Sequence, residues 1–425
     1  MWTWLSFLEL QGFRKEISSC PRVLYHAFGV RGYGHVCTAY RQGRVEFEVC
    51  QASDTLRCSA CGSDQVIRRG QVIRQFKTLP IGGRPTVIVL PVQRLGCQSC
   101  GRVRQVRIAF ADTAKSYTRS FERYAAALCR KMTIGDVANH LQVDWDMIKD
   151  IHKRYLQHRF RNPKLHKLKR IAIDEISIGK GQRYLTVVLD LQSGAVVFVG
   201  QGKGADALNP FFSRLKRTKG GVNRIEAVAT DMSPAYTLAV ARHLPRAIHV
   251  FDRFHVVKLY NEKLSDLRRD IHRSVETIEE KQLLKGTRWL LLKNPQNLDP
   301  DRNEQQRLDD ALRINQPLAT AYYMKEDLRC FWDQSDKNAA EQFIDDWIGR
   351  AQASGIAMLK TFAKTLMLHR RGLLGWYDAP ISTGPLEGTN NKIKTLQRQA
   401  YGFRDQEYFT WLIYGLHEAK YALTG

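Results

Sequence analysis

Hydrophobic and polar positions change their spacing several times along the chain, and the clearest succession lies between residues 170 and 251. Within residues 170–200, three runs of β-branched and aromatic residues are separated by glycine-containing turns, which is typical of three antiparallel strands. Helical and strand patterns then alternate, over residues 205–217, 224–230, 233–244 and 247–251. This order predicts a mixed α/β domain.

Helical spacing prevails on both sides of this α/β region. Long charged segments with four scattered tryptophans predict an all-helical insertion over residues 256–379, with most of these tryptophans in its core. On the other side, Ser120–Met132 is one candidate helix, and Thr133 is placed to cap a second helix that ends near Val143. A further helix begins at Trp145. This pattern fits a helix-turn-helix, although a helical hairpin without DNA-binding function has the same pattern.

The 425 residues carry a formal net charge of +24, with a sequence pI of about 9.8. Because 44% of the residues are hydrophobic, the chain is able to fold, and so large a positive charge then indicates a polyanionic partner. No run approaches the roughly eighteen apolar residues of a membrane-spanning helix, and the first residues lack the basic leader of a signal peptide. We therefore expect a cytoplasmic nucleic-acid-binding protein without a membrane partner.

Four of the nine cysteines form two Cys-x-x-Cys-Gly sequences, Cys58–Cys61 and Cys97–Cys100. Each glycine lets the backbone turn so that amide groups face the thiolates, and four thiolates are a typical ligand set of structural zinc. Strand patterns over Val66–Lys77 and Arg84–Leu95 flank a Pro-Ile-Gly-Gly turn, which predicts a zinc ribbon over residues 56–104. A redox-active pair is the alternative, but two such pairs without thioredoxin-like surroundings favour zinc.

Basic residues gather between the helix-turn-helix pattern and the α/β region, and residues 153–170 include no acidic residue. Such a run is often only a solvated linker. Here it joins a predicted DNA-reading element to the α/β domain, so contact with DNA phosphates is the hypothesis that we prefer. The candidate DNA contacts in this region are Trp145, Lys149, Lys153, Arg154, Arg159 and Arg161.

Two aspartates directly follow predicted strands of the α/β domain. Asp174 comes after the apolar run 171–173, where a charge is unfavourable unless something stabilises it. A hydrogen-bonded aspartate at a strand end is the ordinary explanation, and a metal ligand held by a rigid sheet is the alternative. Asp231 ends the fourth strand. The element order is that of a ribonuclease H-like fold, in which the fourth strand lies beside the first and brings Asp231 towards Asp174.

A third carboxylate, Glu387, lies near the start of a predicted helix in the last part of the chain. The same face carries further candidate DNA contacts, Asn391, Lys394 and Arg398. Acidic oxygen ligands with open positions suit Mg²⁺ or Mn²⁺, and two such ions activate a nucleophile and stabilise the leaving oxygen at phosphorus. We therefore expect Asp174, Asp231 and Glu387 to form one metal-dependent catalytic site.

The chain resembles the bacterial insertion-sequence DDE transposases of the ISL3 family over nearly its whole length. The resemblance rests on CSACG, CQSCG, the helix-turn-helix pattern, IAIDE, ATDMSPAY, VFDRFHV and, most specifically, PLEGTNNKIKTLQRQAYGF. It implies a DDE triad of Asp174, Asp231 and Glu387, and a D-x-x-H signature at Asp252 and His255. It also implies binding of terminal inverted repeats, hydrolysis at the transposon end, and attack of the freed 3′-hydroxyl on target DNA. Pairing two ends of double-stranded DNA implies a homodimer or a larger homo-oligomer.

The expected fold is an α/β multidomain protein with a ribonuclease H-like catalytic core, split by an all-helical insertion and preceded by a zinc ribbon and a helix-turn-helix. The expected domains are an N-terminal segment of unassigned role (1–55), the zinc ribbon (56–104), the helix-turn-helix (115–160), the two parts of the core (166–255 and 380–425) and the insertion (256–379). In a bacterium such a protein would be cytoplasmic and associated with the nucleoid.

Two other functions share part of this pattern. A regulator with an inactive core would bind DNA without metal-dependent cleavage, but it leaves the three carboxylates unexplained. Another ribonuclease H-like nuclease, such as a resolvase, is distinguished by testing for joined products. For Asp252 and His255, a structural hydrogen-bonded pair and a part in the active site both stay open.

Overall fold

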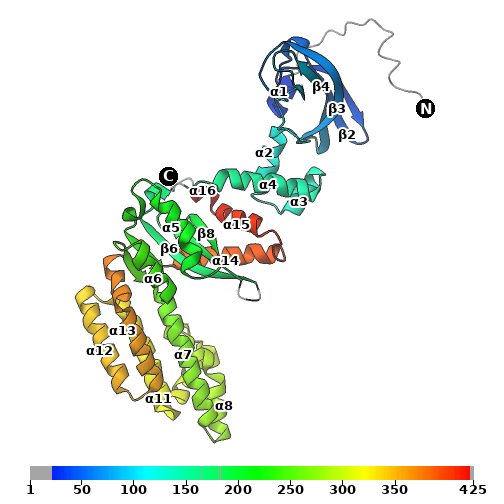
Figure 1. Cartoon of the computed structure of the whole chain (residues 1–425). Coiled ribbons are helices and arrows are strands. Elements are labelled where there is room, and N and C mark those ends of the chain that lie inside the picture. Colours follow the sequence, from blue (N-terminus) through cyan, green and yellow to red (C-terminus); the bar gives the residue numbers. More distant parts are fainter. Residues whose placement is uncertain (1–21, 164, 180, 182, 422–425) are drawn as a thin grey trace. The chain divides into compact units, whose positions relative to one another are not determined.

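The computed structural model describes residues 22–163, 165–179, 181 and 183–421. The chain divides into two compact units, Met1–Arg159 and Phe160–Gly425, and each is described by itself (Figure 1). A helix that crosses a bilayer is not found among the described residues, because none combines the necessary length with sufficient apolarity.

The first unit contains a sheet with the strand order β1-β2-β4-β3, in which β5 also pairs with β4. Its elements are α1 Arg22–Phe28, β1 Tyr33–Arg41, β2 Arg44–Gln51, β3 Val66–Ile81, β4 Arg84–Cys97 and β5 Val103–Gln105. The long β3–β4 hairpin turns at Gly82 and Gly83, which both have positive φ, as a tight turn between twisted strands requires. Because β2 pairs in parallel with β4, residues 33–51 share a sheet with the zinc-ribbon strands. Residues 33–51 therefore do not form a segment separate from the ribbon.

Three helices follow this sheet, α2 Arg119–Leu128, α3 Ile134–Leu141 and α4 Trp145–Phe160. Thr133 and Asp136 form a reciprocal capping box at the start of α3. Gln142 then adopts the left-handed conformation, with φ of 50°, and α4 begins at Trp145. The predicted N-cap at Thr133, the break near Val143 and the start of the next helix at Trp145 are confirmed. The first helix, α2, ends at Leu128 and not at Met132 as predicted.

The second unit is built on a five-stranded mixed sheet with the order β10-β9-β6-β7-β8 (Figure 1). The strands are β6 Arg170–Gly179, β7 Arg183–Asp190, β8 Val196–Gln201, β9 Ala227–Thr230 and β10 Ile248–Phe251. β6, β7 and β8 form the predicted antiparallel meander, and β9 and β10 run parallel to β6. The predicted contact of the fourth strand with the first is confirmed, because β9 pairs directly with β6.

Helices pack on both faces of this sheet. α5 (Asn209–Lys216) and α6 (Pro234–His243) share a hydrophobic core with Ile171 and Ile173 of β6. Neighbouring residues of a strand point to opposite faces, so Asp174 points to the other face. There α14 (Gly384–Gln399) contacts Asp174, and α15 (Gln406–Gly415) packs on β8 before the short α16 (Glu418–Tyr421).

Between β10 and α14 the chain forms a helical segment. Its helices are α7 Arg253–Ser274, α8 Ile278–Gly286, α9 Arg288–Leu292, α10 Glu304–Ile314, α11 Gln316–Arg329, α12 Lys337–Ala353 and α13 Ala357–Asp378. They share one core, in which Trp332 and Trp347 are buried as predicted and Trp376 is half-buried. The core prediction is wrong for Trp289, whose side chain is 65% exposed.

Two glycines allow α13 to approach β10 closely. A Cβ atom at Gly375 would lie 2.5 Å from the carbonyl oxygen of His249, and one at Gly372 would lie 2.3 Å from the ring of Phe251. The carbonyl of His249 belongs to a paired strand and has little freedom to move. A side chain at Gly375 would therefore force α13 itself to shift.

We expect Gly375→Ala to lower the free energy of unfolding by about 1–3 kcal/mol, because overpacking outweighs the roughly 1 kcal/mol that alanine gains over glycine in a helix. Thermal unfolding of the full chain measures the difference. Gly349→Ala in α12 is the control, since no atom lies within 4 Å of its added Cβ. If Gly375→Ala were as stable as Gly349→Ala, the close packing of α13 on β10 would be wrong.

Candidate active site and zinc centre

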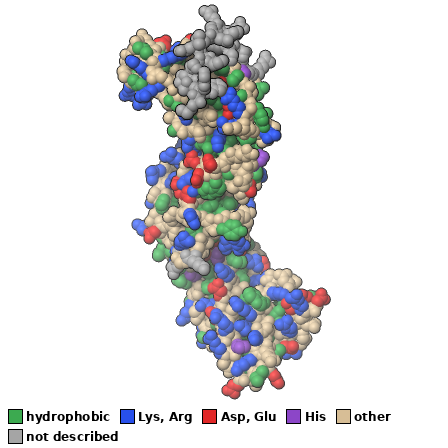
Figure 2. All heavy atoms as spheres, turned by 90° about the vertical axis from the view of Figure 1, so that its right-hand side faces the viewer, with side chains coloured by type: hydrophobic (Ala, Val, Ile, Leu, Met, Phe, Trp, Pro, Cys, Tyr) green, Lys and Arg blue, Asp and Glu red, His purple; other side chains and the backbone are tan. Residues whose placement is uncertain are grey.

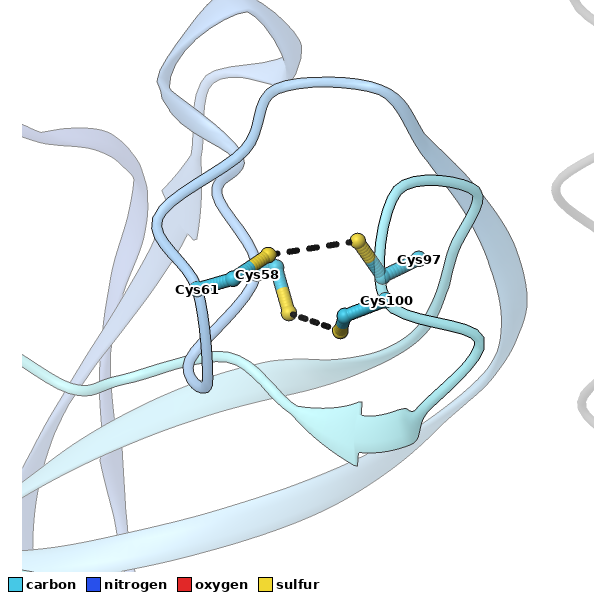
Figure 3. A group of neighbouring side chains, drawn as sticks. All are labelled: Cys58, Cys61, Cys97 and Cys100. Carbon is cyan, nitrogen blue, oxygen red and sulfur yellow. Dashed lines mark hydrogen bonds between the residues drawn. The ribbon is translucent and has the colours of Figure 1, made fainter.

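Four cysteine side chains meet at the end of the β3–β4 hairpin that lies opposite its turn (Figure 3). Their sulfur atoms all lie within 4.8 Å of one another, with 3.8 Å between Cys58 and Cys100 and 3.5 Å between Cys61 and Cys97. Thiolates around a tetrahedral zinc ion, at about 2.3 Å from it, are about 3.8 Å apart, whereas a disulfide requires about 2 Å. The arrangement therefore fits structural zinc.

The two Cys-x-x-Cys turns have the same backbone hydrogen bond. The amide of Gly62 donates to the carbonyl of Cys58 at 2.9 Å, and the amide of Gly101 donates to that of Cys97 at 3.0 Å. Hydrogen bonds from the backbone of Cys61 and Ala60 lower the pKa of Cys58 to about 6. A backbone hydrogen bond from Ser63 lowers the pKa of Cys61, but the neighbouring thiols and burial outweigh it and raise that pKa to about 12. The thiolate is the form that binds zinc, so a bound cation is needed to hold all four cysteines ionised together.

In the second unit, strand register brings two aspartates to one end of the sheet. β6 and β9 are parallel, with Ala172 opposite Ala229. Asp174 lies two residues after Ala172, within β6, and Asp231 lies two residues after Ala229, directly beyond β9. Asp231 therefore comes beside Asp174 at the carboxyl end of β9. The two carboxylates are close enough for the charge of Asp231 to raise the pKa of Asp174.

The carboxylate of Asp174 is half-buried, and both of its oxygens accept hydrogen bonds. Oδ1 accepts from the backbone amide of Glu175 and Oδ2 accepts from Nδ2 of Asn390, each at 2.8 Å. Burial is the main cause that raises the pKa of Asp174; the amide of Glu175 and the charge of His255 oppose it, and the negative charge of Asp231 adds to it. A cation beside the two aspartates would stabilise their ionised forms.

Glu387 lies in the first turn of α14, the helix that packs on β6. It is exposed, and its carboxylate has no hydrogen-bond or ion-pair partner in the described part of the chain. Asn390, three residues later on the same side of the helix, contacts Asp174. Glu387 therefore lies one helical turn before Asn390, the residue of α14 that contacts β6. The three carboxylates are farther apart than the four cysteines, which form the one tight group of potential metal ligands among the described residues.

Asp252, at the end of β10, is buried and connects to the start of α14. Its Oδ1 accepts a hydrogen bond of 3.2 Å from the backbone amide of Thr383, the residue that precedes α14. Its Oδ2 lies 3.3 Å from Nδ1 of His255. Burial lowers the pKa of His255, but the contact with Asp252 and the charges of Asp174 and Asp231 outweigh burial and raise it. Asp252 therefore fixes the start of α14, and the carboxylates around His255 favour its protonated form.

Glu175 is adjacent to Asp174 but points to the opposite face of the sheet. Its Oε1 accepts hydrogen bonds from the hydroxyl of Tyr236, at 2.8 Å, and from the amide of Gly204, at 3.1 Å. These partners hold Glu175 against α6, so it does not take part in the site of Asp174.

The predicted DNA contacts differ in their surroundings. Trp145 is 48% exposed, and Nζ of Lys149 lies 5.4 Å from its ring centroid. Arg154 is half-buried and pairs with Glu122, so it holds α4 against α2. Lys153 is also half-buried. Besides Trp145, the exposed members of the set are Arg159, Arg161, Asn391, Lys394 and Arg398.

The sequence did not single out two residues that hold the site, Asn390 and Thr383. The only signal for Asn390 is its spacing of one helical turn after Glu387. Thr383 has no sequence signal, because its contact with Asp252 joins residues 131 positions apart.

Family models match three regions of the chain. The model of the ISL3 DDE transposases, described as a transposase, matches residues 171–413. A model described as the zinc-finger of transposase IS204/IS1001/IS1096/IS1165 matches residues 54–100. The helix-turn-helix domain of transposase family ISL3 matches residues 109–156. These regions include both Cys-x-x-Cys turns, α2, α3 and most of α4, the sheet with Asp174 and Asp231, and Glu387 on α14.

Similar proteins include two transposases. The transposase for insertion sequence element IS1001 of Bordetella parapertussis is 35% identical, and the match covers 83% of this chain and 86% of that protein. The transposase for insertion sequence element IS1557 of Mycobacterium tuberculosis is 28% identical, with 83% of each chain covered. The similarity thus extends over most of the chain.

Proposed function

The chain belongs to the ISL3 family of DDE transposases, enzymes that cleave and join DNA strands, and from this premise we propose that it moves an insertion sequence by acting at the terminal inverted repeats. In this proposal Asp174, Asp231 and Glu387 are the catalytic triad of a ribonuclease H-like core. The helical segment between β10 and α14 is an insertion into that core. The parallel register of β6 and β9 is the observation that carries the proposal, because it supports a shared site for Asp174 and Asp231.

The donor set suits a divalent cation, Mg²⁺ or Mn²⁺. Asp174 and Asp231 offer carboxylate oxygens at one end of the sheet, and Glu387 would complete the set from α14. Hard oxygen ligands of this kind favour Mg²⁺ over softer metals. When bound, the cation supplies positive charge that activates the attacking oxygen and stabilises the leaving oxygen.

The proposed reaction consists of two displacements at phosphorus. First, a water oxygen bonds to phosphorus at the transposon end, the P–O3′ bond breaks, and the freed oxygen is protonated to a 3′-hydroxyl. This hydroxyl then loses its proton and bonds to a phosphorus of target DNA, where another P–O3′ bond breaks and the freed 3′-oxygen of the target strand takes up a proton. The second step exchanges one phosphodiester for another, so it requires no external energy source and no covalent bond to the protein.

The chain's own residues would orient these reactants. Asp174 is held on both oxygens and Asp252 fixes the start of α14, so the carboxylates are anchored to a rigid sheet and helix. Asp252, Asp174 and Asp231 together favour the protonated form of His255. These contacts support positioning as the main contribution of the protein.

The zinc ribbon and the helix-turn-helix would hold the inverted repeats, with α4 as the reading helix. Lys394 and Arg398 would follow the DNA backbone along α14. Figure 2 shows Lys and Arg side chains spread over the visible face of the protein, as expected for contacts with phosphates. Synapsis of two transposon ends would require at least a homodimer.

Binding to cognate DNA ends should weaken steeply with salt. If about ten phosphates are neutralised, the logarithm of the association constant falls with the logarithm of salt concentration at a slope of roughly −9. Fluorescence anisotropy with a labelled end measures the slope. The double variant Lys394→Ala, Arg398→Ala should reduce the slope by about two, one unit for each lost phosphate contact. An affinity that hardly depends on salt would contradict contacts dominated by the DNA backbone.

A cleavage and joining assay with cognate ends, target DNA and Mg²⁺ tests the proposed function. We expect free 3′-hydroxyl ends followed by joined products. Binding without metal-dependent cleavage would instead indicate a DNA-binding regulator, and cleavage without joining would indicate a nuclease of another kind.

A further inference from the structure

Asn390 connects α14 to the strand of Asp174. It is 7% exposed, and its Nδ2 donates a hydrogen bond of 2.8 Å to Oδ2 of Asp174. Its Oδ1 is buried without a hydrogen-bond partner among the described residues. We propose that Asn390 is a positioning residue, which orients Asp174 for a divalent cation and offers Oδ1 to a water of that cation. This inference rests on the proposed function.

The chemistry of Asp174 determines which way the amide of Asn390 points. An ionised carboxylate only accepts hydrogen bonds, so the NH₂ group has to face it; a reversed amide would bring two acceptor oxygens together. Oδ1 of Asn390 therefore points away from Oδ2 of Asp174, and it requires a donor from elsewhere.

A buried acceptor without a donor costs about 1–3 kcal/mol, and few such groups are found in native proteins. As ligands of a cation, the carboxylates of Asp174 and Asp231 are acceptors only and cannot supply the donor. A hydrated divalent cation would supply such a donor, because Mg²⁺ keeps several of its waters in protein sites and these waters donate hydrogen bonds. The cation that Asp174 would bind thus brings the partner that Oδ1 of Asn390 requires.

The hydrogen bond from Asn390 leaves Asp174 able to bind a cation. A carboxylate has about four lone-pair positions, and the amide of Glu175 and Nδ2 of Asn390 use one on each oxygen. The other described residues use none of the remaining positions, while the two hydrogen bonds fix the plane of the carboxylate. Partners that orient metal ligands in this way typically change metal affinity 10–100-fold.

The test is Mn²⁺ binding to zinc-loaded, full-length Asn390→Leu protein, measured by electron paramagnetic resonance. Leucine has a similar volume but neither donor nor acceptor. We expect Mn²⁺ to bind about 10–100-fold more weakly than in the wild type. Thermal unfolding without added Mn²⁺ and DNA-end binding report separately whether the variant is folded. If leucine prevents folding, Asn390→Ala serves, because a smaller side chain causes no clash.

Two further variants distinguish the possible outcomes. Gln399→Leu removes an exposed amide near the end of the same helix and should leave Mn²⁺ affinity unchanged. Asp174→Asn should abolish Mn²⁺ binding. If Asn390→Leu binds Mn²⁺ as the wild type does while Asp174→Asn does not, the positioning role of Asn390 is wrong and the proposed function stands. If the wild type binds no Mn²⁺, or Asp174→Asn still binds it, the proposed metal site itself is wrong.

Discussion

An Asp174→Asn protein is expected to bind cognate transposon ends as the wild type does and to cleave them on the order of 10³-fold more slowly, or not at all. Asparagine keeps the shape of the side chain but loses the charge and one ligand oxygen. It also presents an amide to Nδ2 of Asn390, where Asp174 presents a carboxylate. Single-turnover cleavage with Mg²⁺ measures the loss, and DNA-end binding without Mg²⁺ shows that the fold is intact.

Asp206→Asn is the matched control for this variant. Asp206 is exposed in the same unit, and its side chain contacts only Asn209 among the described residues, so its neutralisation should leave cleavage unchanged. Wild-type cleavage by the Asp174→Asn protein would exclude Asp174 from the catalytic site.

Replacement of Cys97 by serine is expected to unfold the ribbon end of the first unit and to abolish DNA-end binding. Beside the predicted metal, the two Cys-x-x-Cys turns are joined by a hydrogen bond between Ser63 and Ser99 and by one from the amide of Gln98 to the carbonyl of Gln65. Structural zinc typically contributes about 10 kcal/mol or more to folding, which is comparable to the whole stability of a domain. Zinc content and thermal unfolding of the purified protein measure both effects.

Cys330→Ser provides the control for the zinc prediction. Cys330 is exposed and distant in sequence from the four clustered cysteines, so its replacement should change neither zinc content nor the unfolding temperature. A Cys97→Ser protein with unchanged unfolding and one bound zinc would contradict the four-cysteine site.

The sequence predicted those parts of the fold in which local pattern and global structure agree. The apolar runs that end in Asp174 and Asp231 became β6 and β9, and Thr133 capped α3 as its position indicated. Each of these predictions depends on residues that are near one another in the sequence. The two aspartates could therefore be proposed as catalytic residues from the sequence alone.

Other features could not be predicted from the sequence, because they depend on contacts between residues that are far apart in the chain. The parallel pairing of β2 with β4 joins a short, irregular stretch to the ribbon sheet, and no local pattern indicates it. Hydrogen bonds from Asn390 to Asp174 and from Thr383 to Asp252 join residues more than a hundred positions apart. Trp289 lies on the short helix α9, where helical spacing is too brief to show that its ring is exposed.

Glu387 is the member of the proposed triad with the weakest structural support, because it is exposed and has no described side-chain partner. Its replacement is therefore the most direct test of a DDE site. The measurement is single-turnover cleavage and joining of cognate ends with Mg²⁺ by purified Glu387→Ala protein, with Glu279→Ala in α8 as an exposed control. We expect Glu387→Ala to bind the ends but to yield neither 3′-hydroxyl ends nor joined products, while Glu279→Ala yields both. Cleavage by the Glu387→Ala protein at the wild-type rate would contradict the assignment of the triad.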